Sequence, residues 1–169
     1  MTLKIYTKTG DEGTTGSLEG IRYRKNDTVI EIIGLIDETI ISIQKARYYF
    51  KDEALKKQWD KIIEALYLLG AEISNAKASG LSKYIVQGFV EKLEEKIDEY
   101  YIKTNSFQYF VQISAIECEE ARVRVRKLER GLTILLRHKQ IRPTIYSYIN
   151  RLSDYIFVMS VYAEKNIKD

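Results

Sequence analysis

The run VIEIIGLIDETIISIQKARYYF, residues 29–50, carries the strongest structural signal in the sequence. Its isoleucines recur at spacings of three and four, the period of one helical face, at Ile33, Ile36, Ile40 and Ile43. The β-branched residues would also suit a strand, but the pattern continues well beyond the length of an ordinary strand. We therefore expect a helix here, with Asn26 or Asp27 as its N-cap.

The same apolar period returns along the rest of the chain. We expect four further helices, over residues 52–78, 82–104, from about 114 onward, and 143–165. Pro143 is a favoured residue at the first position of a helix, so it starts the last one. Residues 104–112 lack a helical period, and we expect a loop there. The pattern predicts an all-α fold, a five-helix antiparallel bundle.

Length and composition fit one compact unit. The chain has 169 residues, of which 45% are hydrophobic and 30% are charged, with nine glycines and one proline. These values are typical of a globular protein with few breaks in regular structure, and the length suits a single domain over residues 1–169. Collagen-like, disordered and loop-rich β-sandwich classes are excluded.

Net charge and cysteine content limit the partners and the cellular compartment that the sequence suits. The net charge of +3 is too small an excess to indicate a nucleic-acid partner. Cys118 is the only cysteine, so no internal disulfide can form, which favours the reducing cytoplasm. No apolar stretch approaches the roughly 20 residues that span a bilayer, and the polar start does not resemble a secretion signal. We expect a cytoplasmic protein without a membrane partner.

The segment TKTGDEGTTG, residues 7–16, is the most unusual part of the sequence. It holds three glycines and four threonines outside any expected helix. Glycines let backbone amides approach a ligand closely, while hydroxyl groups and Lys8 can donate hydrogen bonds to anionic oxygens. The spacing matches neither the P-loop nor the dinucleotide fingerprint. The segment is either an ordered phosphate-binding loop or a hydrophilic arm without a ligand.

A row of arginines lies on the fourth expected helix. Arg122, Arg126 and Arg130 are spaced by four, so they share one face. Guanidinium groups bind phosphates bidentately, but charged helix faces are more often solvated or ion-paired. Carboxylates that could pair with them are available at Asp37, Glu38, Glu119 and Glu120.

The last expected helix carries the polar group NRLSD, residues 150–154, within an apolar stretch. Asn150 and Asp154 are one turn apart, so both can point into a groove between helices, as a structural network or as a ligand site.

His138, the only histidine, is expected at the surface near a helix C-terminus. Cys118 is expected to be buried and inert.

Five short motifs occur together in one order: TKTGDEGTTG at 7–16, IDE at 36–38, LGAEI at 69–73, RKLER at 126–130 and NRLSDY at 150–155. In order and separation they resemble the ATP:cob(I)alamin adenosyltransferases of the propanediol-utilisation type, over nearly the whole chain. The resemblance implies a five-helix bundle that forms a homotrimer with an ATP site between adjacent subunits.

The resemblance also implies roles for individual residues. The residues that would wrap the triphosphate are Thr7, Lys8, Thr9, Gly10, Thr15 and Gly16, with Lys25 as a further phosphate-binding lysine. The family's arginine-rich motif corresponds to Arg126, Lys127, Glu129 and Arg130, and it contacts the nucleotide. Glu129 and Asn150 would hold the sugar or base. Arg126 and Arg130 would face phosphates or pair across the interface, with Asp37 of a neighbouring subunit as the partner of Arg126.

The implied reaction is attack of Co(I) in reduced cobalamin on the 5′-carbon of ATP, with release of triphosphate. It needs no protein base, so catalysis would rest on positioning and on the cations Lys25, Arg126 and Arg130. Mg²⁺ would neutralise phosphate charge, and the sequence contains no protein metal site that we can identify.

Cobalamin is the second substrate, and the corrin side of its site is expected near residues 107–114. The family usually carries Leu-Pro-Gly-Gly there, whereas this chain reads FQYFVQIS, so Phe107 or Phe110 would take the place of the family's corrin-facing phenylalanine. Two alternatives stay open. One is an ATP-binding regulatory or chaperone-like trimer that has lost catalysis, and the other is a purely structural bundle.

Overall fold

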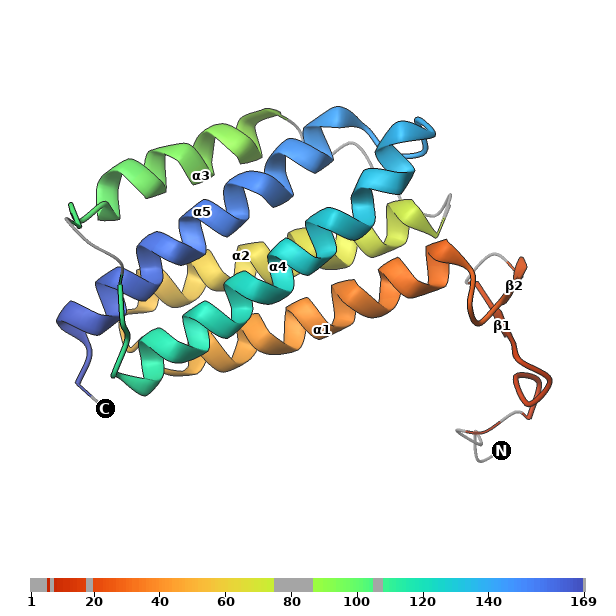
Figure 1. Ribbon diagram of the computed structural model, residues 1–169, viewed down its shortest axis with the longest axis horizontal. Coiled ribbons are helices and arrows are strands. Elements are labelled where there is room, and N and C mark those ends of the chain that lie inside the picture. The colour runs from red at the N-terminus through yellow and green to blue at the C-terminus, as the bar shows by residue number, and fades with distance from the viewer. Residues whose placement is uncertain (1–5, 7, 18–19, 75–86, 105–107, 169) are drawn as a thin grey trace.

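The computed structural model describes residues 6, 8–17, 20–74, 87–104 and 108–168. Five helices dominate it: α1 (Thr28–Tyr48), α2 (Glu53–Ile73), α3 (Gln87–Tyr100), α4 (Ile113–Arg137) and α5 (Pro143–Asn166). Successive helices run up and down along one long axis (Figure 1). The predicted all-α, antiparallel five-helix bundle is confirmed.

The helix boundaries agree with the sequence at most ends. Asp52 caps α2, because its carboxylate accepts a hydrogen bond of 2.8 Å from the Leu55 amide. Asp27 precedes α1 as predicted, but its carboxylate accepts the Arg24 amide instead of capping the helix. Pro143 is the first residue of α5.

Two predicted boundaries differ or cannot be compared. The third helix ends at Tyr100 and not near Thr104, so the connection to α4 is longer than expected. The expected end of the second helix at Ala78 and the expected cap at Ser82 lie outside the described residues.

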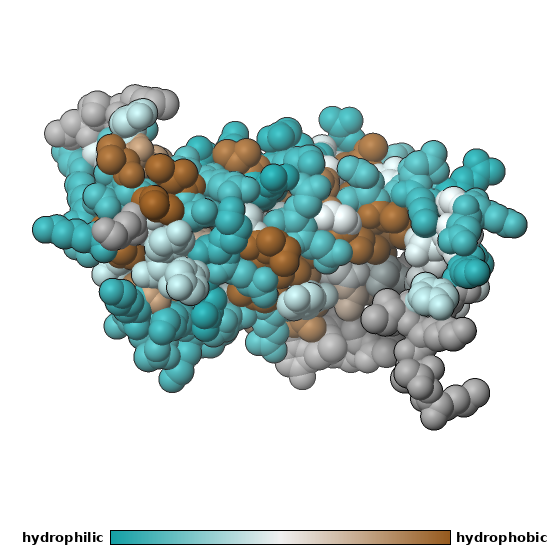
Figure 2. All heavy atoms as spheres, turned by 90° about the horizontal axis from the view of Figure 1, so that it is seen from below, coloured by the Kyte–Doolittle hydropathy of each residue, from teal (hydrophilic) through white to brown (hydrophobic). Residues whose placement is uncertain are grey.

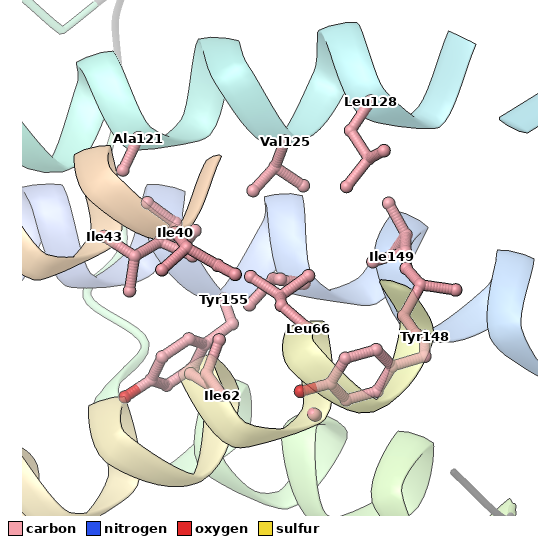
Figure 3. Close-up of a cluster of buried hydrophobic side chains, with 14 of the residues drawn as sticks. Ile40, Ile43, Ile62, Leu66, Ala121, Val125, Leu128, Tyr148, Ile149 and Tyr155 are labelled. Atoms are coloured by element: carbon pink, nitrogen blue, oxygen red, sulfur yellow. The ribbon is translucent and has the colours of Figure 1, made fainter. Parts of the chain in front are cut away.

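The helices pack in the spatial order α2, α1, α4, α5, α3, with α4 and α5 forming the most extensive pair. The apolar stripes predicted from the sequence face inward, and Ile36, Leu66 and Leu128 are among the fully buried residues. Tyr148 and Tyr155 reach from α5 toward α2, where their rings lie beside Ile62 and Leu66 (Figure 3). These long side chains fill the centre of the bundle.

A small hairpin precedes the bundle and was not predicted. Strand β1 (Thr14–Gly16) pairs antiparallel with β2 (Arg22–Arg24), with Thr15 opposite Tyr23. Gly20 has a φ of 80°, which suits a glycine in the connection between the strands. The hairpin lies beyond the end of the bundle where α1 begins (Figure 1).

Candidate functional site

The loop that precedes β1 is folded into successive tight turns. The Asp11 amide donates to the Lys8 carbonyl at 3.3 Å, and the Gly13 amide donates to the Gly10 carbonyl at 3.2 Å. Lys8 and Gly13 both have positive φ, of 59° and 77°. Among the described residues 8–16, the segment is therefore an ordered loop that carries hydroxyl groups, glycines and an exposed lysine, and not an extended arm.

One side chain from the second strand and one backbone amide from the turn after it hold this loop. Arg22 donates to the Thr9 carbonyl and to the Thr14 hydroxyl. The Lys25 amide donates to the Gly13 carbonyl at 2.9 Å. No sequence pattern indicates the role of Arg22, because its contacts depend on a hairpin that is too short to show a period.

The Lys25 ammonium lies directly beside Gly10. A Cβ atom added at Gly10 would lie 3.5 Å from Lys25 Nζ and 3.1 Å from the Thr14 carbonyl oxygen. The fold thus brings Lys25 together with the loop, as the family resemblance implied. Thr15 and Gly16 belong to β1, whereas Thr7 lies outside the described residues.

A polar pair bridges α4 and α5. Asn150 Nδ2 donates to Glu129 Oε1 at 2.9 Å, and both residues are half-buried. One turn away, the Thr133 hydroxyl lies 3.5 Å from the Tyr146 hydroxyl. Two residues that the motifs marked separately therefore meet between α4 and α5, beside a second pair that no motif indicated.

The arginines on α4 fall into two groups. Arg122 is ion-paired with Glu119 at 2.7 Å and its guanidinium lies over the ring of Phe157, so the ion-paired alternative holds for this residue. Arg126 and Arg130 are exposed and have no ion-pair partner in the part of the chain that the structure describes. Two cations beside the Glu129–Asn150 pair are thus available to an anion or to another subunit.

Charged residues on the outer faces of α1 and α4 are mostly paired. Lys127 Nζ lies 3.3 Å from Glu38, which Arg124 also contacts, and these bonds lower the pKa of the Glu38 carboxyl. Lys45 donates to Glu120 at 2.7 Å and lowers the pKa of that carboxyl. Lys127 is therefore engaged by Glu38 within the chain.

Three other residues that the sequence singled out lie apart from the pair. Asp154 is exposed and pairs with Arg151 at 3.0 Å, so the expectation that it points into the groove with Asn150 is wrong. His138 is exposed and follows the end of α4, as predicted. Cys118 is fully buried, and burial raises the pKa of its thiol, which agrees with an inert cysteine.

The loop over residues 8–16 and the segment before α4 lie at opposite ends of the bundle (Figure 1). The N-cap of α4 is Gln112, and Arg126 is 14 positions further on, which at 1.5 Å per residue is roughly 20 Å. Phe110 is half-buried and packs against the core, whereas Phe107 lies outside the described residues. Neither strand of the hairpin packs extensively against a helix. A single chain therefore does not close the loop, the α4 arginines and Phe110 around one ligand.

The described residues lack two features, a membrane-spanning helix and a cluster of metal ligands. No helix there is both long enough and apolar enough to cross a bilayer. Within the same residues, no three side chains of the types His, Cys, Asp and Glu gather in a way that would hold a metal ion.

The fold and the site define a helical-bundle protein with a loop rich in glycine and threonine at one end and a polar pair between α4 and α5. The chain belongs to the cobalamin adenosyltransferase family, whose model matches residues 5–163. It is 31% identical over 163 residues to a corrinoid adenosyltransferase of Citrobacter freundii, and the match covers 93% of each chain.

Solved structures show the same fold. A phenylalanine-to-alanine variant of a PduO-type ATP:corrinoid adenosyltransferase from Lactobacillus reuteri, complexed with cobalamin and ATP, superposes with a TM-score of 0.83 at 28% identity. The match covers 95% of this chain and 93% of that one. An arginine-to-lysine variant complexed with ATP also gives 0.83 at 28% identity, over 95% and 94% of the two chains. Similarity to enzymes over nearly the full length does not favour a regulatory or chaperone-like bundle.

Proposed function

We propose that this protein transfers the 5′-deoxyadenosyl group of ATP to the cobalt of reduced cobalamin and releases triphosphate. Family membership over residues 5–163 supports the activity. The observation that carries the proposal for the site is the position of Lys25, whose ammonium lies beside Gly10 in a loop of glycines and threonines. Such a loop offers backbone amides, hydroxyl groups and positive charge to a polyphosphate.

The reaction is a displacement at carbon. Co(I) supplies an electron pair to the 5′-carbon, the cobalt–carbon bond forms, and the carbon–oxygen bond to triphosphate breaks with its electrons on oxygen. Cobalt is thereby oxidised to Co(III). Because cobalt is the nucleophile, the protein needs no base, and its contributions are alignment of the two substrates and stabilisation of the charge on the leaving triphosphate.

The residues divide into three groups. Thr7, Lys8, Thr9, Gly10, Thr15, Gly16 and Lys25 form the triphosphate site. Glu129 and Asn150 hold the ribose or the base, since their paired carboxylate and amide present both acceptors and donors. Arg126 and Arg130 add positive charge at the phosphates or at a subunit boundary.

We propose that the site is completed by a second copy of this chain within a homotrimer. Asp37 and Arg126 are both exposed, and neither has a partner among the described residues. Apolar side chains lie exposed near them on α1 and α4, including Ile41 at 59% and Val123 at 55%. An apolar surface with unpaired charges of opposite sign suits an interface between subunits.

The described residues do not form a magnesium site of their own. We propose that Mg²⁺ arrives bound to the phosphate oxygens of ATP, as it commonly does in nucleotide sites.

The corrin side is assigned to the segment before α4, with Phe110, or Phe107 outside the described residues, against the ring. The unpaired thiol of Cys118 fits a reducing cytoplasm.

The direct test supplies ATP, Mg²⁺ and chemically reduced cobalamin to the purified protein. The expected products are adenosylcobalamin, seen by its absorbance spectrum, and inorganic triphosphate in equal amount. ATP binding without either product would contradict the proposed activity.

A further inference from the structure

A carboxylate near the end of α5 holds the segment that leads into α4. Glu164 Oε2 accepts hydrogen bonds from the backbone amides of Val111 and Gln112, each at 3.0 Å. The two partners lie more than fifty positions earlier in the chain, |i−j| being 53 and 52. The contact is thus a tertiary link between the C-terminal turns of α5 and the N-terminal end of α4.

The link holds the backbone amides just before and at the N-cap, whereas a local side-chain cap would accept an amide two or three residues further on. Gln112 is the N-cap of α4, a helix of 25 residues, and its side chain makes no capping hydrogen bond. Amides at a helix start have no partner within the helix, and a carboxylate there also interacts favourably with the helix dipole. Hydrogen bonds to an ionised acceptor are about twice as strong as neutral ones. Glu164 therefore fixes the backbone at this point.

The side chains on this backbone segment differ in their exposure to solvent. Phe110 is half-buried against the core. Tyr109 and Val111 on either side of it are 84% and 65% exposed, and Ile113 at the start of α4 is 52% exposed. Apolar surface gathers at this end of the face formed by α1 and α4, at the left in Figure 2. The segment presents an ordered apolar surface to whatever binds there.

The last turns of α5 also hold the other end of the connection between α3 and α4. The ring of Tyr162 meets the ring of Tyr100 edge-on, with centroids 5.4 Å apart. Tyr100 is the last residue of α3, and Tyr162 precedes Glu164 by two positions. Both ends of the connection over residues 101–112 are thereby anchored to one short part of α5.

We propose that Glu164 is a positioning residue for the corrinoid substrate. It touches neither substrate, but it holds the backbone that carries Phe110 and its apolar neighbours at a fixed place. This inference rests on the proposed function, in which that segment faces the corrin. It predicts that loss of the carboxylate weakens use of the corrinoid and leaves use of ATP unchanged, because the ATP loop lies at the far end of the bundle.

The test compares Glu164→Ala and Glu164→Gln with the wild-type protein. Amide hydrogen exchange of residues 108–113 should become roughly ten- to a hundredfold faster in Glu164→Ala, as expected for loss of bonds to a charged acceptor. KM for cob(I)alamin should rise severalfold while KM for ATP stays constant. Glu164→Gln keeps one acceptor oxygen, so its exchange rates and its KM for cob(I)alamin should lie between those of the wild type and those of Glu164→Ala.

Glu53→Gln is the matched control. Glu53 lies in the first turn of α2, where it forms an exposed ion pair with Lys56, and the substitution removes the same charge. It should change neither exchange at 108–113 nor either KM, because such pairs contribute little.

The inference is overturned if exchange at 108–113 is unaffected in Glu164→Ala, or if the two KM values rise together. A wild-type protein that turned over no cobalamin would refute the proposed function and the corrinoid role with it. The exchange measurement would still decide whether Glu164 holds the segment.

Discussion

At the scale of single residues, the contact between Asn150 and Glu129 is central to the account. The donor amide and the acceptor carboxylate come from different helices, so each fixes the rotamer of the other in the groove. A half-buried amide that lost its partner would carry an uncompensated desolvation cost. The pair is thus preorganised for a ligand that replaces or extends its hydrogen bonds.

Asn150→Ala should therefore weaken use of ATP without unfolding the protein. We expect KM for ATP to rise at least tenfold, since a hydrogen bond to a charged partner contributes about 1.5–3 kcal/mol. Steady-state kinetics measures the change, and circular dichroism checks the fold. Asn166→Ala is the control, because that exposed amide donates only to the Tyr162 carbonyl. Equal KM values for wild type and Asn150→Ala would remove Asn150 from the site.

Cys118 should not react in the native protein. Its side chain is fully buried, and burial raises the pKa of the thiol from its ordinary value of 9.0. Because the thiolate is the reactive form, a chromogenic disulfide reagent at pH 8 should titrate no thiol until urea unfolds the chain. A thiol that reacts at once in the native state would show that the packing around α4 is not as described.

At the scale of elements, the loop and the hairpin form one unit. The tight turns of residues 8–13 lead into β1. Arg22 in β2 and Lys25 directly after β2 donate hydrogen bonds to carbonyl groups of these turns. This arrangement explains why the glycine-rich segment is ordered although the helices of the bundle do not cover it. The unit can present Lys25 and the loop amides to a ligand as one surface.

Gly10→Ala tests the close packing within that unit. The added Cβ would lie 3.1 Å from the Thr14 carbonyl oxygen, a backbone atom that cannot move without shifting β1. We expect kcat/KM for ATP to fall roughly tenfold or more, because small displacements of binding groups are costly. Gly88→Ala is the control, since a Cβ there meets nothing within 4 Å. Unchanged kinetics in Gly10→Ala would mean that the loop does not bind the triphosphate.

The helices were predictable because their apolar periods are long. The stripes of α4 and α5 and the start at Pro143 follow directly from residue spacing. The hairpin was missed because strands of three residues show no period. The third helix was predicted, but its end was placed near Thr104 and not at Tyr100. Tyr100 meets the ring of Tyr162, a contact that no local pattern encodes.

The site could be predicted only in part, because local patterns can be seen in the sequence and contacts between distant residues cannot. The motifs indicated Lys25, Glu129 and Asn150, and the fold places Lys25 at the loop and joins the other two. Arg22 and Glu164 act through backbone groups distant in sequence, so residue types alone could not reveal them.

At the scale of the whole molecule, one chain leaves charges and apolar side chains uncovered on α1 and α4. Hollows on this face are bordered by Asp37, Ile41 and Arg124 in one case and by Tyr48 and Glu117 in the other. The loop before β1 and the segment that leads into α4 lie at opposite ends of the same chain (Figure 1). Association of several copies would cover the apolar surface and would let the two ends of different chains approach each other.

Arg126→Ala should accordingly loosen the proposed trimer. If Arg126 pairs with Asp37 of a neighbouring subunit, its loss leaves a carboxylate unpaired in the interface, which is strongly destabilising. Sedimentation velocity at decreasing concentration should show dissociation at higher protein concentration than in the wild type. Arg137→Ala, an exposed change in the last turn of α4, should behave as wild type. A trimer indifferent to Arg126→Ala would count against the pairing.

Acid should destabilise the chain through the charges between α1 and α4. The pKa of Glu38 is lowered from 4.5 by Lys127 and Arg124, and that of Glu120 from 4.5 by Lys45. A lowered pKa means that the contribution to stability is complete above about 4.5 and is lost as the pH falls through the folded-state value. Urea unfolding from pH 7 to pH 3 should show this decline, and Glu38→Gln should make it shallower. An equally steep decline in the variant would assign the acid sensitivity elsewhere.

The most direct measurement is a crystal structure of the protein grown with ATP and Mg²⁺. The account predicts triphosphate density against residues 8–16 and Lys25, with the ribose or base beside Glu129 and Asn150 and a second subunit closing the site. Nucleotide density at any other place, with the loop and the groove between α4 and α5 both empty, would contradict it.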